Sequence, residues 1–333
     1  RPYPSFLASP LHEDTNEDGQ PLGAAVLGEA SDWRAEWKWD GIRGQIVRRG
    51  EGRAIWSRGE ELVTERFPEL TPLLESLPDG TVLDGELLAR KDGEPLPFSQ
   101  LQRRLNRKTV PKTLLKEAPV SFVAYALLEL DHEDLRERGF DQRRAELDRL
   151  VAAVRAQLPA DPLVISPLIE FDSWDELRLL RERSREQRAE GLMLKRGASP
   201  YLTGRKRGDW WKWKVDPFTV DTVLVYAQAG HGRRATIHSD FTLAVRDGDA
   251  YVPVAKAYSG LDDKELTKVD RWIRSNTTER FGPVRAVPAE QVFEIAFEGI
   301  QASPRHKSGI ALRFPRIARW RQDKPVEEID TLD

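Results

Sequence analysis

The sequence predicts two domains of different fold class, an α+β domain over residues 1–215 and a small β-barrel over residues 216–333. A length of 333 residues is enough for two separate hydrophobic cores. Up to Val215, predicted strands alternate with predicted helices, as in a mixed α+β domain. After Asp216 come short strands with one helix, which is typical of a Greek-key barrel such as an OB-fold.

The clearest strand of the first domain covers residues 33–39. Tryptophan and alanine side chains alternate there with Arg34, Glu36 and Lys38, so one face is apolar and the other charged. Further strands are expected at 81–89, 120–128, 192–195 and 210–215, with a two-stranded hairpin at 44–57. Helices are expected around 70–77, over 141–158 with Asp141 as N-cap, and from Ser173, which would form a capping box with Glu176.

The second domain is expected to consist mainly of strands. These fall at 219–228, 234–246, 251–258, 291–298 and 310–314. One helix is expected to begin near Asp262, because Leu266, Val269 and Ile273 then share one face.

Composition places the chain among globular proteins, with 32% charged and 39% hydrophobic residues. No run of about 18 apolar residues occurs, so we expect no membrane-spanning segment. The sequence has no cysteine, which excludes disulfides, thiolate zinc sites and cysteine nucleophiles. It starts with Arg1 rather than methionine, and we therefore expect it to be part of a longer protein.

Positive charge is concentrated locally although the net charge is −3. Three basic blocks cover residues 101–116, 195–214 and 305–324. If these blocks converge in space, they form a phosphate-binding surface. The alternative is that each block is an ordinary solvated face.

The string Lys38-Trp39-Asp40-Gly41-Ile42-Arg43 ends the charged strand in a turn that glycine permits. A lysine at the mouth of a pocket can act as a nucleophile once its ammonium has lost a proton. Exclusion of water and nearby cations favour the neutral amine. The alternative is a surface lysine in a β-turn.

Five other residues fit chemistry on a phosphate. Glu86 and Glu190 stand at strand edges beside glycines, and such carboxylates suit a hard divalent metal ion. Lys212 and Lys214 share one face of a strand, where a bound phosphate would relieve their repulsion. Tyr125 lies on a predicted strand and either stacks on a base or belongs to the core.

The order of these motifs resembles that of covalent nucleotidyltransferases. The strings are EWKWDGIRG, SRGEE, LDGELL, FVAYALL, EGLML, WWKWK and ALRFPRIARWRQDKP, and the resemblance as a whole covers the chain from about residue 5 to the C-terminus. The last string, with Phe293-Glu294-Ile295 and Ser303-Pro304 before it, is similar to the ATP-dependent DNA ligase branch. The resemblance implies an adenylation domain of antiparallel sheets with flanking helices, followed by an OB-fold domain.

The resemblance also implies roles for individual residues. Lys38 would attack the α-phosphate of ATP and become lysyl-AMP. The adenine would lie against Glu36 and stack on Tyr125, while Glu86 and Glu190 would hold the ribose and a Mg²⁺ or Mn²⁺ ion. The remaining cofactor contacts would be Arg43 and Arg58 near the ribose or the nick phosphate, Lys212 and Lys214 on the α-phosphate, Arg207 on the outer phosphates, and Arg313, Arg319, Arg321, Asp323 and Lys324 on the triphosphate.

The implied macromolecular partner is nicked duplex DNA, held through its backbone by the first basic block with Arg103, Arg104, Arg107 and Lys108. We expect a monomer in the cytoplasm of a bacterial type of cell, associated with the nucleoid. Two features depart from the family pattern. Tyr125-Ala126 stands where the family usually has Phe-Asp, and the N-terminal helical DNA-binding domain of the larger ligases is not in the sequence given.

The sequence is also compatible with other functions. An RNA ligase or an mRNA-capping guanylyltransferase would share the lysine motif and the barrel, although Arg313-Phe314-Pro315-Arg316 favours the DNA ligase branch. A non-catalytic OB-fold module that binds nucleic acid would leave Lys38 without a chemical role. A metal-dependent nuclease is less consistent, because the usual clusters of histidine and acidic residues are missing.

Overall fold

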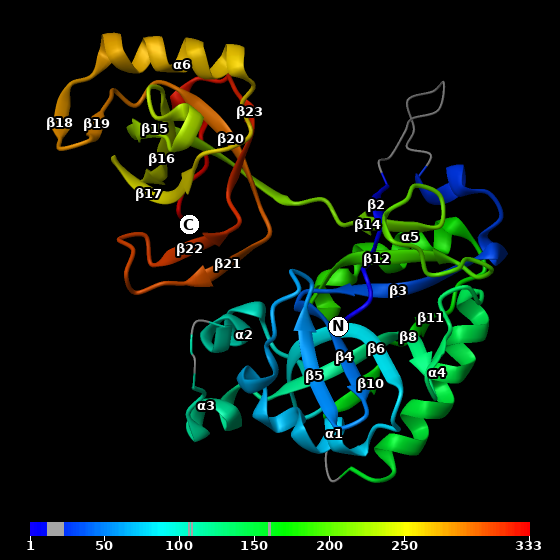
Figure 1. Ribbon diagram of the computed structural model, residues 1–333. Helices are drawn as coiled ribbons and strands as arrows, with labels where there is room; N and C mark the ends of the chain where they lie inside the picture. The colour runs from blue at the N-terminus through cyan, green and yellow to red at the C-terminus, as the bar shows by residue number, and fades with distance from the viewer. Residues whose placement is uncertain (12–22, 106, 108, 159–160) are drawn as a thin grey trace. The chain divides into compact units, whose positions relative to one another are not determined.

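The computed structural model describes residues 1–11, 23–105, 107, 109–158 and 161–333. The chain divides into two compact units, Arg1–Val215 and Asp216–Asp333 (Figure 1). Among the described residues, none of the helices has the length and apolar character needed to cross a membrane.

The first unit contains a large sheet in which the order of the described strands is β10-β8-β6-β4-β5, with β7 beside β6 and β9 beside β8. The strands are β4 (Ile42–Arg49), β5 (Gly52–Ser57), β6 (Thr81–Lys91), β7 (Glu94–Pro95), β8 (Val120–Leu130), β9 (Glu133–Asp134) and β10 (Leu163–Ile165). The helices around it are α1 (Thr71–Ser76), α2 (Phe98–Leu105), α3 (Lys112–Glu117) and α4 (Phe140–Arg155). Its core includes Ile46, Leu83, Phe122 and, from α4, Leu147.

A second sheet of the same unit has the strand order β11-β3-β12-β14-β2. Its strands are β2 (Ser9–Pro10), β3 (Trp33–Trp39), β11 (Leu168–Ile169), β12 (Ala189–Arg196) and β14 (Trp210–Lys214); β1 (Phe6–Leu7) pairs separately with β13 (Gly204–Arg205), and α5 (Trp174–Glu182) packs against β12. Met193 lies opposite Glu36 on one neighbouring strand and opposite Lys212 on the other. Residues that are far apart in sequence therefore form a row across one face.

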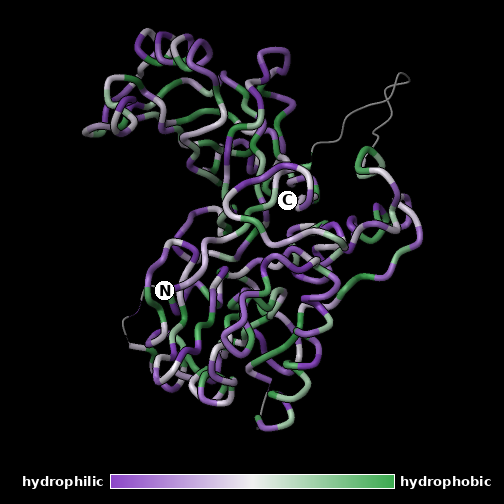
Figure 2. Tube along the Cα trace, turned by 45° about the vertical axis from the view of Figure 1, so that its right-hand side comes forward, coloured by the Kyte–Doolittle hydropathy of each residue, from purple (hydrophilic) through white to green (hydrophobic). Residues whose placement is uncertain are grey.

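The second unit is a strand-rich domain covered by one helix. In its described sheet the order is β17-β16-β15-β19-β18, with β20 pairing with both β15 and β23, and β21 pairs with β22. The elements are β15 (Phe218–Ala229), β16 (His238–Asp247), β17 (Ala250–Ala257), α6 (Asp263–Asn276), β18 (Glu279–Phe281), β19 (Val284–Ala286), β20 (Val292–Phe297), β21 (Gly299–Ala302), β22 (Ile310–Arg313) and β23 (Arg316–Trp320). Figure 2 shows a hydrophilic outer side on α6, whose Leu266, Val269 and Ile273 are buried.

The helix expected near Asp262 is confirmed, and Asp262 forms a capping box with Glu265. Ser173 caps α5 as expected, because its side chain accepts a hydrogen bond from the Glu176 amide. The cap expected at Asp141 is wrong. Gly139 occupies that position, and the Asp141 carboxylate instead binds Arg34 at 2.9 Å.

One residue of α2 that was expected on the DNA-binding surface, Arg104, lies in the interior instead. Arg104 is 1% exposed and forms an ion pair with Glu69, so it holds α2 against the sheet and does not face a duplex. Arg103 is exposed and pairs with Glu117, and Arg107 is also exposed. Lys108 lies outside the described residues.

We expect Arg104→Ala to destabilise the first unit by about 3 kcal/mol, because breaking a buried ion pair leaves its partner uncompensated. Arg103→Ala is the matched control and should cost less than about 1 kcal/mol, since exposed pairs contribute little. Urea unfolding monitored by tryptophan fluorescence measures both values. Equal costs for the two variants would contradict the structural role of Arg104.

Candidate active site

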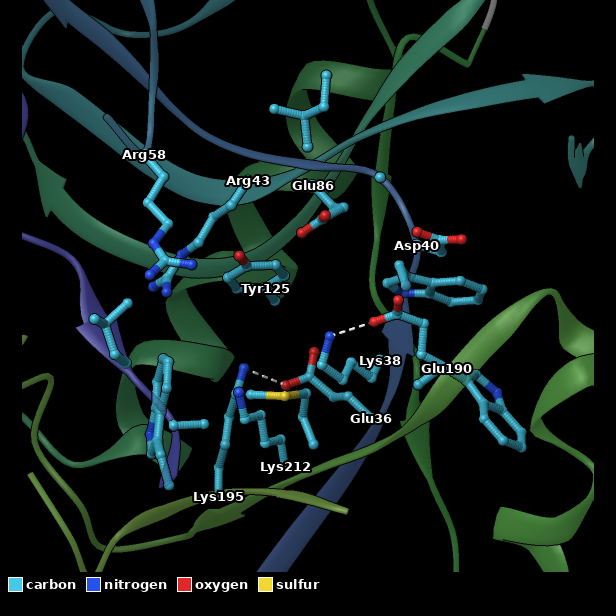
Figure 3. A pocket seen from close by; sticks show the side chains of 18 of the residues that line it. Glu36, Lys38, Asp40, Arg43, Arg58, Glu86, Tyr125, Glu190, Lys195 and Lys212 are labelled. Carbon is cyan, nitrogen blue, oxygen red and sulfur yellow. Dashed lines mark hydrogen bonds and ion pairs between the residues drawn. The ribbon is translucent and has the colours of Figure 1, made fainter. Parts of the chain in front are cut away.

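The first unit contains a cavity of about 530 Å³ that is lined by residues from both of its main sheets. Among its lining residues are Glu36 and Lys38 of β3, Arg43 of β4, and Glu86 and Tyr125 of β6 and β8. Glu190, Lys195 and Lys212 line it from β12 and β14, and the more exposed residues Arg58 and Arg205 line it as well. Figure 3 shows most of these side chains converging on the same space.

Lys38 reaches this cavity from the end of β3. Its Nζ donates to Glu190 at 2.5 Å, and both side chains are roughly one-fifth exposed, at 23% and 20%. The chain then turns at Gly41, where an added Cβ would stand 2.4 Å from the Leu87 carbonyl oxygen. Glycine at this position therefore lets the turn pack against β6 with Lys38 facing inward.

Glu36 lies one strand repeat before Lys38 and is 2% exposed. Its Oε2 accepts a hydrogen bond from Lys195 Nζ at 2.7 Å, and Lys195 is equally buried. Such deep burial of two charges is tolerated because they are paired.

Arg43 is held rigidly at one wall of the cavity. It donates two hydrogen bonds to the buried carboxylate of Asp84, at 2.7 and 3.2 Å, and a third to the Phe6 carbonyl. Tyr201 donates to the same Asp84 at 2.6 Å. Because a bidentate pair fixes the guanidinium plane, Arg43 presents a constant positive charge beside Glu86.

Glu86 is an acid of the cavity whose pKa is strongly shifted. Burial raises its pKa to about 8, with further raising by Asp84 and Glu190, although Lys38 and Arg43 oppose the shift. Burial also lowers the pKa of Lys212, and the nearby cations Lys38, Lys214 and Arg205 lower it further. The cavity therefore combines acids that would bind a cation with amines that would bind an anion.

Eight of the expected site residues line the cavity: Glu36, Lys38, Arg43, Arg58, Glu86, Tyr125, Glu190 and Lys212. Lys214 and Arg207 do not line it. Lys214 is exposed on β14, and the Arg207 guanidinium stacks 5.4 Å from the Trp211 ring.

The expected triphosphate contacts of the second unit form their own network. Asp323 pairs with Arg321, whose other acidic neighbours are Asp221 and Glu294, and Lys324 binds Asp221 at 2.5 Å. Arg319 lies 3.9 Å from Glu294, and Arg313 stacks 5.0 Å from the Phe314 ring.

Two cations of the cavity were not assigned to it from the sequence, Lys195 and Arg205. Strand alternation places Lys195 on the same face as Met193, which was a usable signal. The pairing of β12 with β3, which brings Lys195 to Glu36, could not be predicted from any sequence pattern.

Two family models match this chain. The model for the ATP dependent DNA ligase domain matches residues 23–214, and the model for the ATP dependent DNA ligase C terminal region matches residues 234–324. A probable DNA ligase of Koribacter versatilis (strain Ellin345) is 40% identical over 349 residues, covering 100% of this chain and 59% of the relative. A DNA ligase of Methanoculleus marisnigri is 35% identical over 312 residues, covering 93% and 55%. The chain thus spans little more than half of these relatives.

Solved structures show the same fold. The ligase domain from M. tuberculosis LigD is 25% identical with a TM-score of 0.51, and 98% of this chain and 97% of that chain are covered. A structure from work on Lig E DNA ligases is 19% identical with a TM-score of 0.63, covering 96% and 99%. The first unit therefore has the nucleotidyltransferase fold and the second the OB-fold, and the chain belongs to the ATP-dependent DNA ligase family.

Proposed function

We propose that the chain is the catalytic core of an ATP-dependent DNA ligase that seals nicks in duplex DNA through lysyl-AMP on Lys38. The observation that carries this proposal is the position of Lys38 in a cavity whose described lining also includes five further cations and four carboxylates. An incidental surface lysine, as in a non-catalytic binding module, would have no reason to be enclosed in this way.

In the first step, the Lys38 amine attacks the α-phosphorus of ATP, a nitrogen–phosphorus bond forms, and pyrophosphate leaves. The proton of the ammonium must go elsewhere, and the carboxylate of Glu190 at 2.5 Å is placed to accept it. Lys212, together with Arg58 and Arg205, offsets the negative charge of the phosphates. Catalysis here is mainly positioning and charge neutralisation.

In the second step, a DNA 5′-phosphate takes the adenylate from Lys38. In the third, a 3′-hydroxyl attacks the adenylated phosphate and releases AMP. The same cations can serve all three steps, because each step moves negative charge on a phosphate at one place. The expected contacts of Arg313, Arg319, Arg321, Asp323 and Lys324 with the triphosphate remain part of this proposal, as do those of Lys214 and Arg207.

A divalent metal ion fits the cavity, because Mg²⁺ commonly binds one or two carboxylates together with substrate phosphates. Glu86 and Glu190 are the residues that would hold it, and they are close enough for Glu190 to raise the pKa of Glu86. Magnesium, or manganese in its place, would supply further neutralisation of phosphate charge.

The proposed substrate implies a location with the cell's DNA. Duplex binding through the backbone would use Arg103 and Arg107, which are exposed at and just beyond the end of α2. No preference for base sequence is expected, because a ligase must accept any nick.

Nick sealing with ATP and magnesium tests the function. The chain should seal a nicked duplex, and Lys38→Ala should lose this activity. The same variant should still seal a nick whose 5′-phosphate already carries AMP, because that step needs no lysine nucleophile. Lys91→Met, at an exposed lysine outside the cavity, is the control. Labelling by GTP in place of ATP would instead favour a guanylyltransferase.

Glu86 should make stability depend on pH. Its raised pKa means that the folded chain keeps a proton up to about pH 8, whereas an unfolded glutamate loses it near 4.5. The free energy of unfolding should therefore fall as pH rises through this window. Glu86→Gln removes the effect, so the variant should gain stability relative to the natural chain as pH rises, measured by urea unfolding. Glu75→Gln, at an exposed position, is the control, and the same trend in both variants would refute the assignment.

Charge reversal tests the DNA surface. The double variant Arg103→Glu/Arg107→Glu should weaken binding to nicked duplex and reduce the slope of log K against log salt by about two, at roughly 0.9 per lost phosphate contact. Arg149→Glu/Arg183→Glu, at two exposed arginines elsewhere in the first unit, is the matched control. Identical salt slopes in both double variants would exclude this surface.

A further inference from the structure

Lys195 is the deeply buried cation of the cavity that the proposed chemistry does not use. Its ammonium is enclosed by three aromatic rings, with centroids at 4.4 Å for Trp210, 4.6 Å for Tyr125 and 5.6 Å for Phe140. Its side chain is 2% exposed, and its ion-pair partner is Glu36. A single amine thus contacts Glu36 and Tyr125, the two residues that the family resemblance leads us to expect at the adenine.

The contact with Lys195 uses only one of the two carboxylate oxygens of Glu36. Oε2 accepts the hydrogen bond from Lys195 at 2.7 Å, while Oε1 is buried and has no hydrogen-bond partner among the described residues. Arg144 Nη1 is 3.8 Å from Oε1, beyond hydrogen-bond range. Arg144 Nη1 is itself buried without a hydrogen-bond partner among the described residues, so it forms an ion pair with Oε1 but no hydrogen bond. An unsatisfied buried carboxylate oxygen is costly, and Oε1 is therefore open to a hydrogen-bond donor from a ligand.

Figure 3 shows Glu36 with one oxygen joined to Lys195, and Tyr125 and Lys38 beside the same space. We propose that Lys195 is a positioning residue for nucleobase specificity: by holding Oε2 it fixes Glu36 as a hydrogen-bond acceptor toward the base. This inference rests on the proposed function and concerns the same site.

The consequence is selection between two kinds of purine. A purine with a 6-amino group donates a hydrogen bond and satisfies Oε1, whereas a purine with a 6-oxo group places a second acceptor against it. A 6-oxo purine would leave the charged Oε1 without a donor and would place its own oxygen against it. This costs more free energy than the loss of a hydrogen bond between neutral groups. The cavity should therefore prefer ATP to ITP.

The positioning role makes a distinctive prediction for Glu36→Gln. Lys195 should still bind the oxygen of the new amide, which turns the NH₂ group toward the base and favours a 6-oxo purine. In the double variant Glu36→Gln/Lys195→Met the amide is free to turn, so this reversed preference should disappear. A merely structural role for Lys195 predicts the same preference in both variants.

The experiment is a calorimetric titration with the α,β-methylene analogues of ATP and ITP, which cannot transfer AMP to Lys38. A pH of about 6 favours the ammonium form of a desolvated lysine. We expect the unaltered chain to prefer the ATP analogue roughly tenfold or more, the size of one hydrogen bond to a charged group. Lys195→Met should lose most of this preference and Lys195→Arg should recover part of it. Lys91→Met, at an exposed lysine, should match the unaltered chain.

An unchanged preference in Lys195→Met would overturn the inference. If that variant fails to fold, equal preferences in Glu36→Gln and Glu36→Gln/Lys195→Met would overturn it instead. A second measurement on the unaltered chain, covalent labelling with ATP, tests the proposed function independently of the role of Lys195. The expected preference without any lysyl-AMP would refute the ligase proposal and leave the role of Lys195 standing, whereas binding of neither analogue would refute both.

Discussion

The antiparallel pairing of β3 with β12 is the constraint on which the rest of the site depends. It brings Lys38 to Glu190 and Lys195 to Glu36, so that two lysine–glutamate pairs stand in one cavity. The register shifts between Ala189 and Leu192, where Gly191 has a φ of +142° and an added Cβ would stand 2.3 Å from the Trp213 carbonyl oxygen. Glycine is needed there because no other residue adopts this backbone so close to a neighbouring strand.

The two pairs differ in a way that suits different tasks. Lys38 and Glu190 are partly exposed, so a substrate can separate them at modest cost. Lys195 and Glu36 are each 2% exposed, and separating them would strand a charge in the protein interior. The first pair can therefore change during a reaction, whereas the second is a fixed part of the cavity wall. The rigid Arg43–Asp84 contact has the same fixed character.

Much of the fold could be predicted because the relevant signals are local. Alternation over 33–39 predicted β3 and its charged inner face, and the capping pattern at Asp262 predicted α6. Short strands such as β18 and β19 carry too few residues for alternation to be recognised. The expected strand at 234–246 begins only at His238, because Gly232–Arg234 forms a 3₁₀ turn.

The site was less predictable where it depends on pairing between distant segments. Arg104 belongs to a basic block by sequence, but it is buried because Glu69, 35 residues earlier, offers a charge partner inside the fold. Lys195 belongs to another basic block, yet it faces Glu36 across two strands whose pairing leaves no mark on either sequence. Motif order identified Lys38, Glu86 and Glu190, while geometry was needed to separate Lys212 from Lys214.

The central claim is that Lys38 is the nucleophile of the cavity, whereas its other two lysines, Lys195 and Lys212, act as fixed charges. Peptide mapping by mass spectrometry, after incubation of the chain with ATP and magnesium, tests it most directly. The account predicts a single AMP on the peptide that contains Lys38. An AMP on Lys195 or Lys212, or no adduct on a chain that binds ATP, would contradict it.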